Sequence, residues 1–423
     1  MRQMKMLGIG VSLVAVLLMF AGYASATSYT STATGGAWTD GSTWVGGVAP
    51  SAGDTGTIVA TATVTISGSL NETANLYGTL TLTAPGSFAG LQYLNLEGGT
   101  LNLNGTCYNW ATNFSTINVD VDSYVVGTGG NPGGGGPNRF GTVNGVVPSP
   151  GPNSVLLVGS HNLTLTGLNE FRPKANSTSS GNETYSGTYI VNAVAGSVMF
   201  LERAIISSNW ATGNYALASG STVQMGYGNS SDTNETYAHT LSGSGTWTIP
   251  YAGIKLTLAS GAVVRPGAAN AADAATLTLG GTGYNYEFKS GSDVQMDITS
   301  ASTNDLLLFP TATSSAVVTI DSGAILDVNL FTPGVTTVIS NMVLWDANHT
   351  NVTLTGDYNS GGVINYNNAA GWTGLSVVES GKQILFSGTY TAGSPPVPEP
   401  ATLLLVGTGV LGVFGYIRRR RMS

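Results

Sequence analysis

The amino-acid sequence predicts an all-β protein: a right-handed parallel β-helix (solenoid) with an N-terminal signal helix and a C-terminal transmembrane helix. Three observations predict this fold class. Only 9% of the 423 residues are charged, yet 42% are hydrophobic and 59 are glycine, which suits a folded, strand-rich chain. Leucine alternates with threonine or asparagine in short runs, and some of these runs recur 21 residues apart, as Leu80 and Leu101 do.

The N-terminal segment, residues 1–26, has the three parts of a secretory signal peptide. Arg2 and Lys5 precede the apolar run 7–20, and Ala24 and Ala26 place small residues around a cleavage site. We therefore expect signal peptidase to remove this segment, so it does not enter the prediction of the folded body, residues 27–396.

Five short runs in the body alternate between leucine and a small polar residue. They are residues 79–83, 100–104, 163–166, 255–258 and 276–279. A period of two places leucine on one face of a strand and the polar residue on the other, as in a half-buried strand. Outside the export segments, no stretch shows the i, i+3, i+4, i+7 spacing of an amphipathic helix, so the body is expected to be nearly all β.

The spacing of these strands distinguishes a solenoid from a sandwich. Three recurrences indicate a period of 21 or 22 residues: Leu80 with Leu101, Leu256 with Leu277, and the pair Met296 and Ile298 with Val318 and Ile320. Such a period suits one coil of a parallel β-helix, in which like residues stack. Shorter spacings such as Leu94 to Leu101 suit hairpins, so a β-sandwich or jelly-roll portion stays open as the alternative.

A glycine- and proline-rich stretch, residues 127–151, interrupts the strand pattern. It contains Gly133-Gly134-Gly135-Gly136-Pro137 and Pro148-Ser149-Pro150-Gly151, which fit neither a strand nor a helix. We expect a long surface loop or a break between two sub-domains. No Gly-Lys-Ser/Thr follows, so a phosphate-binding loop is not expected.

The charge balance argues against nucleic acid as a partner. Of 22 acids and 14 bases, the two export segments hold one acid and six bases, so the body keeps 21 acids and 8 bases, a net charge of −13. Binding to phosphates needs lysine and arginine. The lone Cys107 cannot form an internal disulfide and has no metal-site spacing.

The sequence offers few candidates for chemistry, and we expect no catalytic residue, cofactor or metal site. His161, His239 and His349 lie far apart, without a second ligand at metal spacing. Asp120 with Asp122, and Asp293 with Asp297, place two carboxylates on one side of a strand. Either pair suits Ca²⁺ or an acid/base pair, but solvated turn or strand-end residues are the favoured interpretation.

Sugar contact is the alternative interpretation of the aromatic residues, for which packing is favoured, and glycosylation is the alternative for the asparagine sequons, for which composition is favoured. Tryptophans are spread along the body at Trp110, Trp210, Trp247, Trp345 and Trp372. Aligned on one face, aromatic rings would stack on a glycan; otherwise they pack in the core. Asn-x-Ser/Thr sequons occur at Asn71, Asn104, Asn113, Asn162, Asn176, Asn182, Asn229, Asn234, Asn348 and Asn351. They permit envelope glycosylation, or simply reflect composition.

The C-terminal segment, residues 397–423, has three parts in a fixed order. Val397-Pro398-Glu399-Pro400 is followed by the uncharged run 401–417 and then by Arg418-Arg419-Arg420-Arg421. A helix of that run spans roughly 26 Å, close to the hydrocarbon core of a bilayer. The prolines keep the glutamate extended and accessible, and the arginines favour the cytoplasmic side and stop transfer there.

These residues resemble the PEP-CTERM sorting signal, which in Gram-negative bacteria is recognised by an exosortase. The resemblance implies export, passage through the inner membrane as an anchored intermediate, and cleavage that releases the protein to the cell surface or extracellular matrix. An ordinary membrane anchor that is never cut is the alternative.

The body is similar to autotransporter-passenger β-helix proteins in low-complexity motifs. They are Trp38-Thr39-Asp40 with Trp44 and the run 47–54, then 241–246, 261–267, 304–308 and 323–328. The resemblance implies a β-helix and no particular chemistry.

Three functional hypotheses follow. The first is a non-enzymatic structural protein of the cell surface or matrix that associates with exopolysaccharide in a biofilm. The second is a carbohydrate-binding adhesin, which requires exposed aromatic residues in a row. The third is a β-helical polysaccharide lyase or hydrolase, which requires acids and a base converging in a groove.

Overall fold

The computed structural model describes residues 26–392 with gaps at 69, 71, 84–92, 105–114, 129–138, 142–154, 169, 173–183, 194–197, 202–212, 226–233 and 269–273. The signal segment up to residue 25 and the sorting segment 397–423 lie outside the described residues. The described part is all β and contains no α-helix; its one helical element is a 3-10 turn, η1 (Gly41–Thr43).

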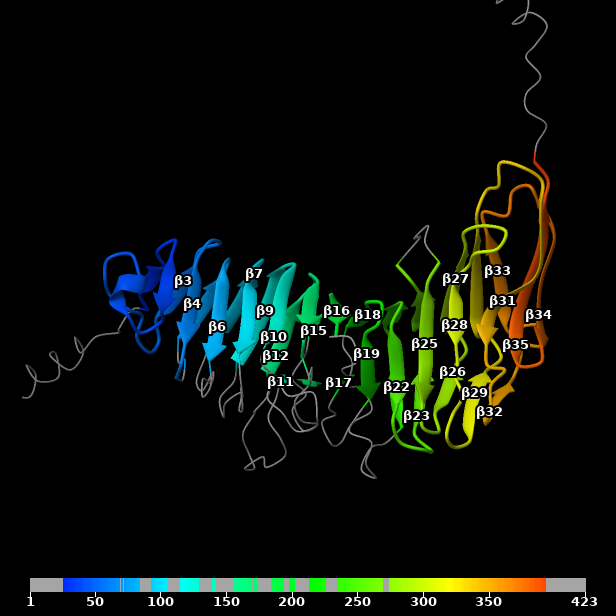
Figure 1. Cartoon of the computed structure of the whole chain (residues 1–423), viewed down its shortest axis with the longest axis horizontal. Coiled ribbons are helices and arrows are strands. Elements are labelled where there is room, and N and C mark those ends of the chain that lie inside the picture. The colour runs from blue at the N-terminus through cyan, green and yellow to red at the C-terminus, as the bar shows by residue number, and fades with distance from the viewer. Residues whose placement is uncertain are drawn as a thin grey trace, which may run out of the picture.

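Four sheets make up the described part of the molecule (Figure 1), and the long sheet runs from β2 to β33. The N-terminal sheet consists of β1 (Ser28–Thr30), β3 (Thr55–Ile58), β5 (Thr73–Leu76), β7 (Tyr93–Glu97), β9 (Ser115–Val121), β12 (Val155–Gly159) and β15 (Thr184–Tyr185). The long sheet consists of β2 (Gly35–Ala37), β4 (Thr63–Ile66), β6 (Thr79–Thr83), β8 (Thr100–Asn104), β10 (Ser123–Thr128), β13 (Leu163–Thr166), β16 (Thr188–Asn192), β18 (Asn214–Leu217), β21 (Thr240–Gly243), β24 (Val263–Pro266), β27 (Asp293–Ile298), β30 (Ile325–Leu330) and β33 (Val363–Asn367).

The other two sheets belong to the later part of the chain. The mixed sheet consists of β11 (Arg139–Gly141), β14 (Glu170–Arg172), β17 (Val198–Leu201), β19 (Thr222–Met225), β22 (Thr246–Ile249), β25 (Thr276–Gly281), β28 (Leu306–Leu308), β31 (Thr337–Asp346), β35 (Gln383–Tyr390) and β34 (Trp372–Ser380). The C-terminal sheet consists of β20 (Glu235–Tyr237), β23 (Lys255–Leu258), β26 (Asn285–Phe288), β29 (Ala316–Ile320) and β32 (Val352–Thr355).

Consecutive strands of the chain lie in different sheets, and each strand pairs in parallel with its counterpart one circuit later. Up to β10 a circuit holds two strands, as when β5 and β6 are followed by their partners β7 and β8. From β12 onward most circuits hold three, as β22, β23 and β24 do before β25, β26 and β27. We call residues 28–128 the narrow region and residues 155–392 the wide region.

The five strands predicted from alternation are confirmed as β6, β8, β13, β23 and β25. The predicted spacing is correct only in the narrow region, where Leu80 pairs with Leu101. In the wide region it is wrong, because Leu256 pairs with Tyr286 and Leu277 with Leu307. The predicted recurrence of Met296 and Ile298 at Val318 and Ile320 is also wrong. Their partners are Val328 and Leu330, because the third strand lengthens each circuit.

The glycine- and proline-rich stretch 127–151 lies mostly outside the described residues. The strands on either side of it nevertheless pair with each other, β9 with β12 and β10 with β13. The N-terminal sheet and the long sheet therefore both continue across the stretch where the sequence allowed either a surface loop or a break between two sub-domains.

Antiparallel pairing is confined, among the described strands, to the C-terminal end. There β31 pairs with β35, and β35 pairs with β34. This end rises above the rest of the molecule in Figure 1, and the chain leaves it toward the sorting segment. The mixed sheet therefore ends in the two antiparallel strands β35 and β34, and Phe386 of β35 packs against Tyr366 of β33, with ring centroids 6.3 Å apart.

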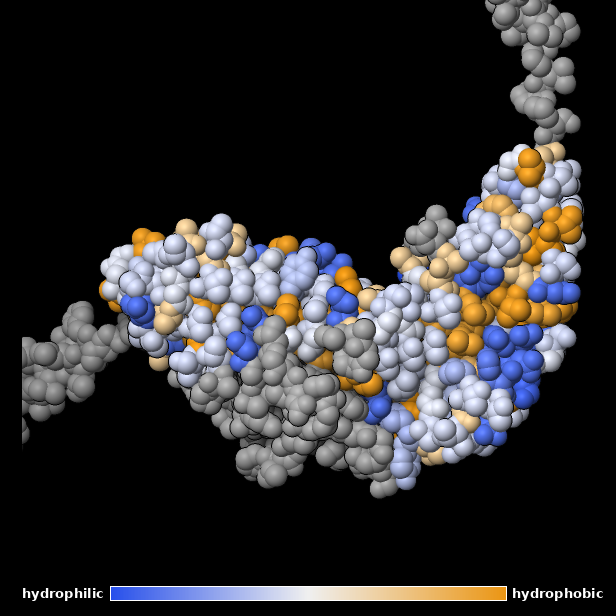
Figure 2. All heavy atoms as spheres, in the orientation of Figure 1, coloured by the Kyte–Doolittle hydropathy of each residue, from blue (hydrophilic) through white to orange (hydrophobic). Residues whose placement is uncertain are grey.

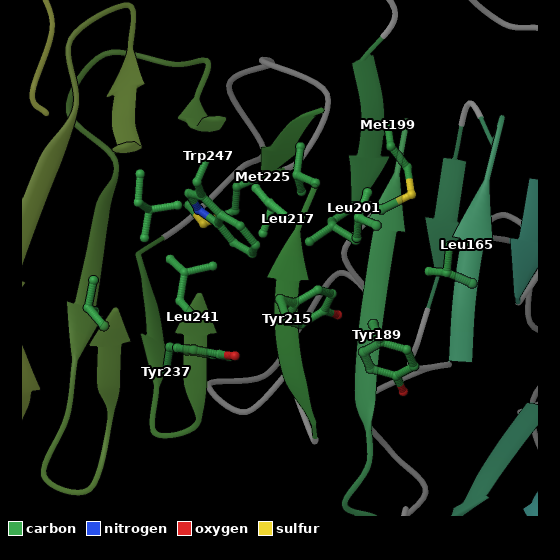
Figure 3. Packing of buried hydrophobic residues seen from close by; sticks show 14 of the residues in the cluster. Leu165, Tyr189, Met199, Leu201, Tyr215, Leu217, Met225, Tyr237, Leu241 and Trp247 are labelled. Atoms are coloured by element: carbon green, nitrogen blue, oxygen red, sulfur yellow. The ribbon is translucent and has the colours of Figure 1, made fainter. Parts of the chain in front are cut away.

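The core changes character along the molecule. In the narrow region it is aliphatic apart from Trp38 and Trp44 at the N-terminal end, and Val64, Leu80, Leu101 and Val125 stack in one buried row. Tyrosines enter at the start of the wide region, where Tyr189 and Tyr215 lie with ring centroids 5.1 Å apart (Figure 3).

Tyr185 and Tyr237 lie two circuits apart, before β16 and β21, and close their turns in the same way. The Tyr185 hydroxyl donates to the Thr188 carbonyl at 3.3 Å, and the Tyr237 hydroxyl donates to the Thr240 carbonyl at 2.8 Å. Each hydroxyl also reaches a carbonyl of the preceding circuit, that of His161 or Gly213. A buried ring thus fills the core while its polar tip remains hydrogen-bonded.

Candidate functional site

The tryptophans proposed as a glycan-stacking series are core residues where the structure describes them. Trp247, Trp345 and Trp372 are at most 7% exposed. Trp345 packs between Phe288 and Phe309, with centroid distances of 4.8 and 5.5 Å. Trp110 and Trp210 lie outside the described residues, as does Cys107.

The motif around Trp38 builds the N-terminal end of the core. Trp38 and Trp44 are buried in an edge-to-face pair with centroids 4.8 Å apart, over Gly56, where a side chain would collide with both rings. Asp40 accepts from the Ser42 amide and holds the 3-10 turn. Asp54 accepts from the backbone N–H groups of Thr27 and Ser51. These residues are a cap and offer no chemistry.

The first carboxylate pair does not form a site. Asp120 is exposed and is the last residue but one of β9, whereas Asp122 lies in the bend that follows the strand. Asp122 accepts from the Asn162 backbone N–H at 2.8 Å and lies 3.6 Å from the His161 imidazole. Asp122 is therefore a turn residue that fastens one circuit to the next, in agreement with the favoured interpretation.

The second carboxylate pair is joined by a third acid. Asp297 is buried, and its backbone N–H donates to the Asp305 carboxylate at 3.0 Å. Asp305 also accepts from the Ala275 N–H and is 1% exposed, so burial raises its pKa to about 7. Burial also raises the pKa of Asp293, against the opposing hydrogen bond from Gln295.

This arrangement organises backbone rather than facing a ligand. The Asp305 carboxylate holds the start of β25 and the end of β27 together, and Asp297 accepts from the Asn329 amide at 2.6 Å. No group of three or more His, Cys, Asp or Glu side chains in the described part of the chain is arranged to hold a metal ion.

An ion-pair chain crosses three circuits on the C-terminal sheet. Glu287 lies 2.7 Å from the Lys255 ammonium and 2.8 Å from that of Lys289, which in turn lies 2.8 Å from Asp321. Burial alone would raise the pKa of Glu287, but hydrogen bonds and charge from the two lysines outweigh it and lower the pKa to about 2. The ammonium groups of Lys255 and Lys289 are thus engaged in ion pairs that link neighbouring circuits.

The remaining histidines are dispersed. His239 packs edge-on against Tyr237, with centroids 5.8 Å apart, and burial lowers its pKa. His349 lies 3.5 Å from Asp346. His161, His239 and His349 therefore belong to separate turns, and the structure brings none of them together.

The outer surface of the N-terminal sheet carries a feature that sequence reasoning missed. Asn75, Asn95 and Asn118 occupy the same register position on β5, β7 and β9. Asn95 donates to the Asn75 Oδ1 at 2.7 Å, and Asn118 donates to the Asn95 Oδ1 at 2.6 Å. Tyr93, 49% exposed, stands two residues before Asn95 on the same face.

We call the surface formed by Tyr93, Asn75, Asn95, Asn118 and Glu97 the amide face. The sequence contains a pattern that indicates this face: an asparagine between two apolar residues, which is repeated after 20 residues and again after a further 23. The triplets are Ala74-Asn75-Leu76, Leu94-Asn95-Leu96 and Ile117-Asn118-Val119.

Three sequons in the described residues use their side chains within the fold. Asn234 Oδ1 accepts from the Lys255 backbone N–H at 2.9 Å. The Asn351 amide donates to the Ala312 carbonyl, and Asn351 has a φ of 64° that asparagine tolerates better than most residues. The Asn162 amide donates to Asp122. Asn104 and Asn348 are exposed, whereas Asn71, Asn113, Asn176, Asn182 and Asn229 lie outside the described residues.

No helix in the described part of the chain is both long and apolar enough to cross a bilayer. The predicted membrane segment 401–417, the sorting residues Val397, Pro398, Glu399 and Pro400, and the four arginines lie outside that part, as do the signal residues Arg2 and Ala24.

Comparison with known proteins identifies the C-terminal segment only. No curated protein and no solved structure matches the chain. The resemblance of the body to autotransporter passengers finds no support from any family match. Residues 396–421 match the PEP-CTERM protein-sorting motif, which implies exosortase-dependent export, an anchored intermediate and sorting to the surface.

Proposed function

We propose that this chain is a non-enzymatic structural protein of the cell surface or extracellular matrix of a Gram-negative bacterium. Its body would be a right-handed parallel β-helix that associates with exopolysaccharide, after signal peptidase and an exosortase have processed its two ends. The observation that carries this proposal is the sorting motif at residues 396–421, attached to a body of stacked parallel circuits.

The topology supports the β-helix. Parallel strands of one sheet need a crossover, and such crossovers are right-handed in nearly all proteins. Each circuit here supplies one strand to each sheet it enters, which is how a solenoid builds a continuous core from short repeats.

The distribution of polar groups supports a structural role. The buried acids Asp297 and Asp305 receive backbone N–H groups, and the lysines of the C-terminal sheet are paired with carboxylates. Groups that an enzyme would present to a substrate are here used to fasten circuits to one another.

The test is the intact mass and location of the protein in its native host, with and without substitution of Pro398, Glu399 and Pro400 by alanine. We expect the wild-type protein to lose its C-terminal segment and to be recovered outside the cell. The variant is expected to keep the segment and accumulate in the membrane. An uncleaved wild-type chain held in the membrane would overturn the sorting proposal.

A further inference from the structure

We propose that the amide face, on the outer surface of the N-terminal sheet, binds a neutral polysaccharide chain. This inference rests on the proposed function and names the surface and the chemical class of glycan. The amide face consists of Tyr93, Asn75, Asn95, Asn118 and Glu97, all of which point away from the core.

Tyr93 supplies the apolar contact that sugar recognition needs. Along β7, Leu94 and Leu96 are fully buried, whereas Tyr93, Asn95 and Glu97 alternate with them on the outside. The Tyr93 side chain is 49% exposed. A phenol ring held on a strand offers a flat apolar surface with a polar edge, which suits the face of a pyranose ring.

The asparagine ladder supplies hydrogen-bond donors at a regular spacing. Neighbouring strands lie about 4.8 Å apart, so the three amides repeat at that distance along the axis of the molecule. Each amide has two N–H donors. Asn118 donates one to Asn95, Asn95 donates one to Asn75, and Asn75 donates one to the Thr57 hydroxyl at 3.2 Å. The second N–H of each amide can therefore meet the hydroxyls of successive sugar units in an extended chain.

Carboxylates at the other end of the same strands supply acceptors. Glu97 ends β7, and Asp120 stands near the end of β9 on an exposed position. Ionised carboxylates accept strong hydrogen bonds from hydroxyl groups. Val121, which pairs with Glu97 and is 44% exposed, adds a small apolar surface beside them.

The charge of this surface selects neutral glycans. The strands β3, β5, β7 and β9 contain no lysine or arginine, and their charged residues are Glu97 and Asp120. An acidic polysaccharide would meet like charge without a compensating cation, which is unfavourable. The same absence of lysine and arginine disfavours single-stranded nucleic acid, which needs a positively charged groove beside its stacking platforms.

The test compares binding of the mature protein to immobilised neutral glycans, such as cellulose, a mixed-linkage glucan and mannan, with binding to alginate as the acidic probe. We expect retention by at least one neutral glycan, little changed by salt, and no retention by alginate. Tyr93→Ala should weaken binding about tenfold, the change that corresponds to loss of one good aromatic contact. Tyr93→Phe should retain most of it.

Tyr251→Ala is the matched control, because Tyr251 is 40% exposed but lies in the turn between β22 and β23. We expect it to bind like the wild type, and circular dichroism should show that both alanine variants are folded. If the wild type binds a neutral glycan and Tyr93→Ala binds equally well, this inference is wrong and the proposed function stands. Retention by alginate alone would also overturn it. If the wild type binds no glycan, the exopolysaccharide part of the proposed function fails as well.

Discussion

The narrow and wide regions are built from the same parallel strands but fill their interiors differently. In the narrow region two strands per circuit enclose rows of leucine and valine, such as Leu80 above Leu101. In the wide region three strands per circuit enclose a broader interior, which Phe288, Phe309 and Trp345 fill. Apart from the Trp38–Trp44 pair at the N-terminal end, the large buried aromatic rings thus lie in the region with three strands per circuit.

The outer surfaces differ as well. In Figure 2 the narrow region is mostly pale, whereas strongly polar and strongly apolar residues gather at the C-terminal end. Ladders of amide side chains occur in both regions. Asn75, Asn95 and Asn118 form one in the narrow region, whereas Asn329 and Asn367 extend one from Asp297 in the wide region.

The largest expected effect is loss of an aromatic side chain from the wide core. Trp345→Ala should lower the free energy of unfolding by about 4 kcal/mol, because the fully buried ring leaves a cavity between Phe288 and Phe309. Urea denaturation measures this loss. Val338→Ala, at a 67% exposed position, is the control and should change stability by less than about 0.5 kcal/mol. A loss below about 1 kcal/mol for Trp345→Ala would show that the wide core is loosely packed.

A truncation in the narrow core sharpens the contrast. Leu101→Ala should cost about 3 kcal/mol, because the fully buried leucine packs in a row that has little freedom to collapse. In a stacked fold each circuit contacts only its neighbours, so the damage should remain local. Hydrogen exchange should show lost protection in β6, β8 and β10 and unchanged protection in β25. Equal loss in β25 would contradict the independence of the two regions.

Titration of Asp305 should affect the wide region alone. Burial raises the pKa of Asp305 in the folded protein from 3.8 to about 7. At a pH between these two values, the folded protein therefore binds one more proton than the unfolded chain. The free energy of unfolding should therefore fall as pH rises from about 4 to about 7, by about 3 kcal/mol. Asp305→Asn should flatten this dependence in urea titrations at pH 5 and pH 8. An unchanged slope in the variant would mean that Asp305 is ionised at both pH values.

The smallest effect concerns the ion-pair chain. Glu287→Gln should cost about 1 kcal/mol at pH 7, because Lys255 and Lys289 lose a shared partner at a partly exposed site. The pKa of Glu287 is lowered from 4.5 to about 2, so its stabilisation is complete above pH 4.5 and is lost as pH falls to about 2. The two proteins should then converge in stability near pH 2. A difference that persists there would have to come from packing.

The sequence predicts the narrow region well and the wide region less well. Strands such as 79–83 and 100–104 alternate without interruption, and a circuit of two strands brings Leu80 to Leu101 after one sequence period. In the wide region a third strand lies between two strands that pair with each other. The nearest segment of similar sequence therefore belongs to another sheet and is not the pairing partner. Leu256 is 30 residues from its partner Tyr286, and neither size nor chemistry reveals the pair.

The candidate surface was less predictable than the strands. Alternation shows that Asn75, Asn95 and Asn118 point outward, but only the pairing of β5, β7 and β9 aligns them. Core packing was the favoured interpretation for the tryptophans, and it is confirmed for Trp247, Trp345 and Trp372; tyrosines lie both in the core, as Tyr215 does, and outside, as Tyr93 does. Residue type alone does not distinguish a buried position from an exposed one, because the side chains of tryptophan and tyrosine are both amphipathic.

The long sheet continues from β2 to β33, which has a consequence for how the molecule responds to a pull along its axis. Tension along the axis acts in the direction of the hydrogen bonds that join neighbouring strands. These bonds therefore break one circuit at a time rather than all together. Each circuit that opens releases its own length of chain. The 26 residues between Tyr189 and its partner Tyr215 would extend to roughly 90 Å. A molecule of this kind would lengthen stepwise under axial load and dissipate energy at each step.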